Sequence, residues 1–256
     1  MNLFVLLKTV PDTVEELSIA ADNTSLDPEW LRFKLSDSDE HALEQALLLK
    51  ERHGGTVTVA ALDAPEVEEA LFQALAKGAD RAVKLTGELG DVRSLAAAQL
   101  FAGYLKSAGG TAADALILLR SQAIDDLEGE IAPFLADLLG LPYLGVVVAV
   151  ATGDGGVTVT KEFAGGMRGE FAMPMPAVLG IQAAEKPPRY VPIAKVRAAM
   201  KTTTLETIDV APDRPARFPI ERMHKPEAAG RAEMIEGSPE EVANRIVDLL
   251  ANQSLI

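Results

Sequence analysis

The fold is decided by residues 114–142, which read DALILLRSQAIDDLEGEIAPFLADLLGLP. This stretch begins with an apolar run at 115–119, continues through a polar turn at 120–128, and then shows helical periodicity. The apolar residues of that last part recur at helical spacing and share one face: Ile131, Phe134, Leu135, Leu138 and Leu139. Gly140 and Pro142 end the predicted helix. A buried strand that leads into a helix N-terminus is the unit with which open α/β sheets hold anions and nucleotides.

The chain before this stretch alternates between apolar strands and amphipathic helices. Strands are predicted at 3–7, 56–62, 81–85 and 116–119. Between them, the first helix is capped by Ser36 or Ser38 and ends at Gly54, the second begins at Pro65, and the third begins at Asp91. Such alternation predicts a parallel sheet with helices on both faces, a Rossmann-like α/β fold. No GxGxxG follows the first strand, which disfavours the dinucleotide fold of that signature.

After residue 142 the pattern becomes that of an antiparallel extension. Glycine-rich turns at 153–156 and 165–166 separate strands at 144–152, 157–161 and 168–173, and a buried strand follows at 176–181. We interpret these strands as a meander added to the parallel sheet. The sequence therefore predicts one nucleotide-binding-type domain over residues 1–183.

Residues 184–256 are predicted to form an arm that leaves this domain. Residues 184–237 carry little periodicity, and so long an irregular segment does not suit the interior of a compact domain. A terminal helix follows, with Ser238 as its cap, Pro239 at its first position and Glu241 at its third. Its short apolar stripe would dock on a partner subunit or back on its own domain, and the sequence does not choose between them.

Composition narrows the classes of partner. The net charge is −14 and the pI is about 4.7, so the chain repels phosphate backbones and is not expected to bind nucleic acid. Cysteine is absent, which removes disulfides and thiolate chemistry. No run approaches the ~20 apolar residues of a membrane span, and no targeting segment is visible, so we expect a cytoplasmic protein without membrane insertion.

The residues offer little catalytic chemistry. His41, His53 and His224 are scattered, which argues against a metal site, and His41 and His53 are expected to be solvated. Asp125 and Asp126 are the one carboxylate pair that would support a small-molecule enzyme, and adjacent acids in a turn are more often turn or cap residues. The only tryptophan, Trp30, is expected to pack beneath the loop at 14–37.

Six motifs, in order over nearly the whole chain, resemble those of the small (beta) subunits of electron-transfer flavoproteins. Residues 8–13 resemble K-x-V-P-D-T, residues 39–47 resemble D-E-Y-A-L-E-E-A-L, and residues 74–82 resemble A-L-A-x-G-A-D-R-A. Residues 122–126 match Q-A-I-D-[GD], residues 176–178 match the end of L-P-A-V, and residues 188–190 match the end of E-P-R-Y. Six motifs in register make this resemblance specific.

The resemblance implies a non-catalytic electron carrier with a Rossmann-like, adenine-nucleotide-hydrolase-like fold. Such a beta subunit pairs with an alpha subunit that holds most of an FAD, and it shuttles electrons from dehydrogenases to a quinone-linked oxidoreductase. It also implies AMP in this subunit, or a second FAD in flavin-bifurcating members. The alternatives are a stand-alone adenine-nucleotide-binding regulatory module, which would have no use for the arm, and the enzyme supported only by the carboxylate pair.

The resemblance also assigns residues to these roles. Docking of dehydrogenases falls to an exposed arm around Ile193, with Tyr190, Pro192 and Lys195 beside it. The nucleotide and flavin would lie against a set drawn from the strand ends and the turn: Leu6, Lys8, Asp39, Ala61, Gln122, Ala123, Asp126, Gly129, Glu130 and Ile131.

Several positions depart from the family pattern. The family's glycine-lysine pair before Q-A-I-D is Arg120-Ser121 here, and the ring that often lies near the flavin is replaced by Ser38. Glu128, Glu130 and Asp63 add negative charge where the phosphate would lie, against the attraction of the helix dipole. These changes predict that nucleotide binding in this subunit is weak, altered or lost, with Arg120 as the candidate compensating cation.

Overall fold

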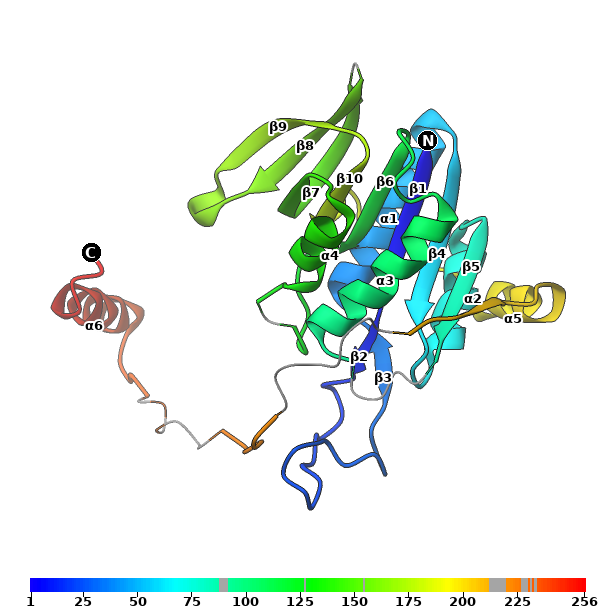
Figure 1. The fold of residues 1–256 in the computed structure, drawn as a ribbon. Coiled ribbons are helices and arrows are strands. Elements are labelled where there is room, and N and C mark those ends of the chain that lie inside the picture. Colours follow the sequence, from blue (N-terminus) through cyan, green and yellow to red (C-terminus); the bar gives the residue numbers. More distant parts are fainter. Residues whose placement is uncertain are drawn as a thin grey trace.

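A mostly parallel sheet forms the centre of the molecule (Figure 1). The computed structural model describes residues 1–87, 92–126, 128–153, 155–211, 220–226, 230, 232 and 234–256. Over these residues the main sheet has nine strands, in the order β11 (Glu206–Asp209), β5 (Arg81–Thr86), β4 (Thr56–Leu62), β1 (Asn2–Leu7), β6 (Ala115–Arg120), β10 (Ala177–Ile181), β7 (Tyr143–Gly153), β8 (Gly156–Glu162) and β9 (Arg168–Pro174). A small antiparallel pair, β2 (Thr9–Pro11) and β3 (Phe33–Leu35), extends beyond the end of β1.

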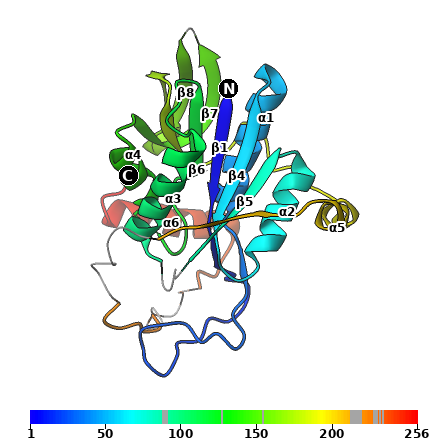
Figure 2. The same ribbon diagram turned by 45° about the vertical axis from the view of Figure 1, so that its right-hand side comes forward.

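Helices cover both faces of this sheet (Figure 1, Figure 2). Helices α1 (Asp37–His53) and α2 (Val67–Lys77) pack on one face, and α3 (Ser94–Ala108) and α4 (Ile131–Leu139) pack on the other. Side chains of β1 alternate between the two layers: Leu3, Val5 and Leu7 join the α1/α2 core, while Phe4 and Leu6 join the α3/α4 core. A strand buried on both faces is apolar, as residues 3–7 of β1 are. The predicted fold class is confirmed.

The antiparallel extension is confirmed, with one correction. β8 pairs antiparallel with β7 and with β9. β10, however, is no strand of the meander, because it lies between β6 and β7 and runs parallel to both. All five of its residues are buried, which only a position inside the sheet provides.

Local signals place most helix ends correctly. Ser36 caps α1 by accepting a hydrogen bond from the backbone N–H of Asp39, and Gly54 ends that helix. α2 begins at Val67, two residues after the predicted Pro65. Asp91 and Asp154, the predicted helix start and turn residue, lie outside the described residues. Trp30 does not pack beneath its loop, because 78% of its surface is exposed.

The C-terminal part contains more regular structure than its sequence predicts. Helix α5 (Ile193–Thr202) packs on α2, and β11 then joins the edge of the main sheet in parallel with β5. The expectation of an irregular segment is therefore wrong for residues 193–202 and 206–209, and its residues 212–219, 227–229, 231 and 233 lie outside the described part of the chain. Helix α6 (Pro239–Asn252) begins with the predicted capping box of Ser238 and Glu241. It contains no buried residue and lies clear of the sheet in Figure 1. Among the described helices, none has the length and apolarity of a membrane span.

Candidate functional site

The candidate site lies at the carboxyl ends of β1, β4 and β6. These three parallel neighbours end at one edge of the sheet, where the first turn of α1 and the N-terminus of α4 also lie. Of the predicted residues, Leu6 and Ala61 belong to the hydrophobic cores on opposite faces of the sheet, so the structure does not bring their side chains together. The polar residues of the prediction fall into two groups around the end of β6.

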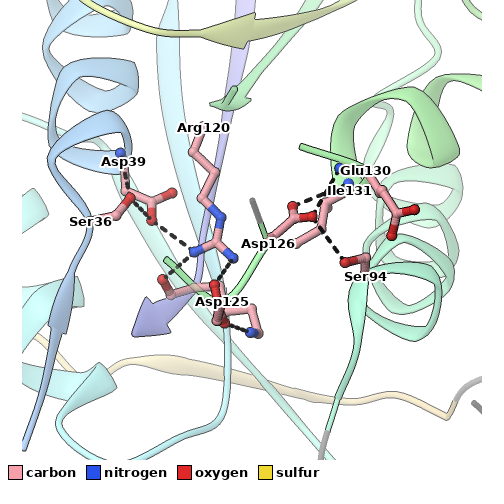
Figure 3. A network of polar contacts seen from close by, with 9 residues as sticks. Ser36, Asp39, Ser94, Arg120, Asp125, Asp126, Glu130 and Ile131 are labelled. Carbon is pink, nitrogen blue, oxygen red and sulfur yellow. Dashed lines mark hydrogen bonds and ion pairs between the residues drawn. The ribbon is translucent and has the colours of Figure 1, made fainter. Parts of the chain in front are cut away.

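The first group surrounds Arg120, the last residue of β6 (Figure 3). Its side chain is 2% exposed. Nη1 lies 3.3 Å from Oδ2 of Asp39 and donates to the carbonyl of Lys8 over 3.1 Å, and Nη2 lies 2.9 Å from Oδ1 of Asp125. The ammonium of Lys8 also pairs with Asp125. Two cations and two carboxylates thus neutralise one another where β1, α1 and β6 meet.

Asp39 is the most deeply placed acid of this group, with no exposed surface. The hydroxyl of Ser36 donates to its Oδ2 over 2.8 Å, while its Oδ1 and the Nε of Arg120 have no hydrogen-bond partner. Burial raises the pKa of the Asp39 carboxyl above its ordinary value, and the positive charge of Arg120 opposes that change. Each of these two buried groups therefore needs the other as its charged partner.

The second group lies at the N-terminus of α4 and is built around Asp126. Its Oδ1 accepts from the backbone N–H of Glu130 at 3.0 Å and from the hydroxyl of Ser94 at 3.1 Å, and its Oδ2 accepts from the N–H of Ile131 at 3.4 Å (Figure 3). Free N–H groups at a helix start are what an anion binds. Here a carboxylate of the same chain already occupies two of them.

A tight turn holds this carboxylate in place. Ala123 and Asp126 exchange two backbone hydrogen bonds, of 3.2 and 3.0 Å. Gly129 follows with φ +66°, and a Cβ atom at that position would lie 2.2 Å from the carbonyl oxygen of Ser121. Gln122 and Glu130 are exposed. The turn is therefore shaped by its own contacts, with its polar side chains on the rim.

The predicted docking residues form one exposed surface at the start of α5. Pro192 caps the helix and Ile193 is its first residue, with 61% of its surface exposed. Tyr190 is 86% exposed, and Lys195, in the first turn of α5, is exposed as well. Val196, by contrast, is buried, which fixes the opposite side of α5 on the body. This arrangement leaves the four predicted side chains available to another protein.

Sequence reasoning missed the contacts that hold the start of this arm on α1. Arg189 binds Glu44 and Glu51, and Arg52 binds Glu185 through two hydrogen bonds. His41, expected to be solvated, accepts a hydrogen bond from the backbone N–H of Ala184 at its Nδ1. The sequence offered one signal for these contacts, namely Arg189 in the P-R-Y motif, because a charged residue inside such a motif is expected to have an oppositely charged partner.

Comparisons with known proteins place these features in context. Residues 29–213 match the family model described as electron transfer flavoprotein domain. The chain is 30% identical to the electron transfer flavoprotein subunit beta of Bacillus subtilis (strain 168), with full coverage of both chains. It is 29% identical to the subunit beta of Clostridium acetobutylicum, again with full coverage of both. It is 27% identical to that of Methylophilus methylotrophus, with 98% of each chain covered.

Proposed function

The chain belongs to the electron transfer flavoprotein family, among its beta subunits, and on that premise we propose that it pairs with an FAD-bearing alpha subunit and carries electrons. It would accept them from dehydrogenases and deliver them to a quinone-linked oxidoreductase. When bound, FAD supplies the chemistry of accepting and releasing electrons. This chain contributes cover for the flavin, a docking surface and no catalytic side chain of its own.

The observation that carries the pairing is the uncovered apolar stripe of α6. Ile246, Val247, Leu249 and Leu250 are each at least 36% exposed, on a helix that has a complete capping box. Exposed apolar stripes of this kind are characteristic of protein–protein contacts. Of the arm predicted over residues 184–256, we infer that α6 contacts the alpha subunit, while α5 and β11 lie on the nucleotide-binding-type domain of residues 1–183.

The stripe also favours this proposal over a stand-alone nucleotide-binding module, which would leave it exposed to water. The docking part of the proposal draws on the exposed group around Ile193, since an aliphatic side chain on a fixed helix is a suitable anchor for a partner.

Co-expression with the neighbouring large-subunit gene tests the proposal. We expect a yellow complex with a flavin absorbance spectrum and the mass of one alpha and one beta chain, whereas the chain expressed alone is colourless. A beta chain that stays colourless and forms no complex would contradict the proposal.

A further inference from the structure

We propose that the nucleotide corner of this subunit is filled by its own side chains, so that it binds neither AMP nor a second FAD. The corner consists of the Arg120 group and the Asp126 group described above. This inference rests on the proposed function, because only a subunit of that family is expected to hold a nucleotide here. It does not affect the flavin shared with the alpha subunit.

The phosphate end of the corner is occupied by a carboxylate. A phosphate at the start of α4 would be bound by the free N–H groups of the first turn, and those of Glu130 and Ile131 already donate to Asp126. Phosphate and carboxylate carry the same sign of charge, so the phosphate cannot share this place and must displace the carboxylate. Displacement would break the contact with Ser94 and uncap the helix.

The cations of the corner, Arg120 and Lys8, do not offset the negative charge at its phosphate end, because both are already paired. Arg120 does not serve as the free cation that its sequence position suggests, because its guanidinium is bound to Asp39, Asp125 and the carbonyl of Lys8. Lys8 is paired with Asp125 in turn. The acids that flank the helix start, Glu128 and Glu130, are exposed and would repel an incoming phosphate.

The space between β1, α1 and β6 is filled by the guanidinium. The side chains of Arg120 and Asp39 are 2% and 0% exposed, so both charges lie away from bulk solvent. A ligand that entered would separate two buried charges, and a buried charge without its partner is strongly unfavourable. The chain therefore stabilises this corner with an internal ion pair and does not depend on a nucleotide.

The nucleotide content of the heterodimer tests this inference directly. The purified complex is extracted with acid, and the released nucleotides are separated by chromatography and quantified. We expect about one FAD per heterodimer and only background AMP, and we expect that added AMP leaves the melting temperature of the complex unchanged. AMP near the FAD content, two FAD per heterodimer, or a rise in melting temperature with AMP would each overturn the inference.

The same preparation separates this inference from the proposed function. A complex without any flavin contradicts the proposed function, whatever its AMP content. A complex with flavin and stoichiometric AMP contradicts only the filled corner.

A pair of variants tests the role of Arg120 itself. Arg120→Met removes the guanidinium but keeps much of its volume, and it leaves Asp39 buried without a cation, so the melting temperature should fall clearly. Asp39→Asn added to it removes that charge and should restore a large part of the loss. An Arg120→Met variant as stable as the wild type would show that the ion pair does not hold the corner. If either variant fails to fold, the nucleotide content of the wild-type complex still decides.

Discussion

The guanidinium of Arg189 binds both carboxylate oxygens of Glu44: Nε lies 2.9 Å from Oε2, and Nη2 lies 2.8 Å from Oε1. The backbone N–H of Arg189 donates to the same carboxylate at 3.0 Å. Glu44 belongs to α1 and its side chain is only 4% exposed. This bidentate pair fixes the start of the arm on the domain, four residues before Ile193.

Replacing Arg189 should therefore destabilise the protein. Arg189→Ala leaves the carboxylate of Glu44 buried without a cation, and we expect a loss of about 3 kcal/mol in the free energy of unfolding. Urea-induced unfolding followed by circular dichroism measures it. Arg168→Ala is the matched control, since Arg168 is 66% exposed and pairs with the exposed Glu162, and it should cost about 1 kcal/mol or less. Equal losses in the two variants would argue against a role of Glu44 in fixing the arm.

The neighbouring ion pair makes part of the stability dependent on pH. Hydrogen bonds from Arg52 lower the pKa of Glu185 below its ordinary value of 4.5. A carboxyl with a lowered pKa stabilises the fold above its ordinary pKa, and that contribution is lost as the pH falls through the folded-state value. Unfolding midpoints of the wild type and Glu185→Gln, measured from neutral pH to about pH 3, should differ most above pH 4.5 and converge in acid. A difference between the two midpoints that stays constant over this range would show that the pKa of Glu185 is not lowered by its pairing with Arg52.

Alanine variants at two glycines with the same backbone φ angle would distinguish the cost of a strained backbone from the cost of a steric clash. Gly129 and Gly140 both have φ +66°, but a Cβ atom at Gly129 would lie 2.2 Å from the Ser121 carbonyl oxygen, and at Gly140 nothing lies within 4 Å. Gly140→Ala should cost about 1 kcal/mol from the left-handed backbone alone. Gly129→Ala should cost about 3 kcal/mol or more, because the turn must also open. Thermal unfolding of both variants checks the order, and the opposite order would contradict the described turn.

Docking at the start of α5 can be tested without disturbing the fold. Ile193 is exposed, so Ile193→Ala should change the free energy of unfolding by about 0.5 kcal/mol or less. If this side chain is the anchor, the same variant should weaken the complex with a dehydrogenase by about 2 kcal/mol, or roughly 30-fold. The measurement is the rate of flavin reduction by the dehydrogenase as the carrier concentration is varied. Met200→Ala, an exposed apolar residue farther along α5, is the control and should leave the rate unchanged.

If α6 pairs with the alpha subunit, a charge in its apolar stripe should weaken that complex without affecting the fold. Ile246→Asp places a charge in the apolar stripe, and Asn244→Asp places the same charge on another exposed position of the helix. Because α6 contains no buried residue, neither variant should unfold the isolated chain. Ile246→Asp should weaken the complex with the alpha subunit by about 2 kcal/mol or more, and Asn244→Asp should leave it nearly unchanged. Size-exclusion chromatography at falling concentration measures both, and equal dissociation would show that the stripe is not the contact.

The parts of this fold that were predictable from sequence are those specified by local chemistry. The four apolar strands, the Ser36 cap, the Gly140 stop and the capping box at Ser238 each depend on residues a few positions apart. The family assignment was confirmed for the same reason, because its motifs are short and lie in register.

The parts that escaped prediction depend on distant partners. Arg189 and Glu44 are 145 positions apart, and Arg120 and Asp39 are 81 apart. β11 has four residues and no periodic pattern, and it becomes a strand only because the edge of β5 offers it unpaired backbone groups. Arg120 was identified as a cation of the site, but its partners were not, so its charge was assigned to a phosphate instead of to two carboxylates.

Helix α5 is anchored at both of its ends, by Arg189 on α1 before it and by β11 on the sheet after it. Its conformational freedom is therefore lost once, when the subunit folds, and not at every encounter with another protein. A small contact on such a rigid element can form quickly and still dissociate quickly. Under the proposed function, the carrier must leave one protein before it can reach the next, and a docking surface held in this way would allow recognition without long residence.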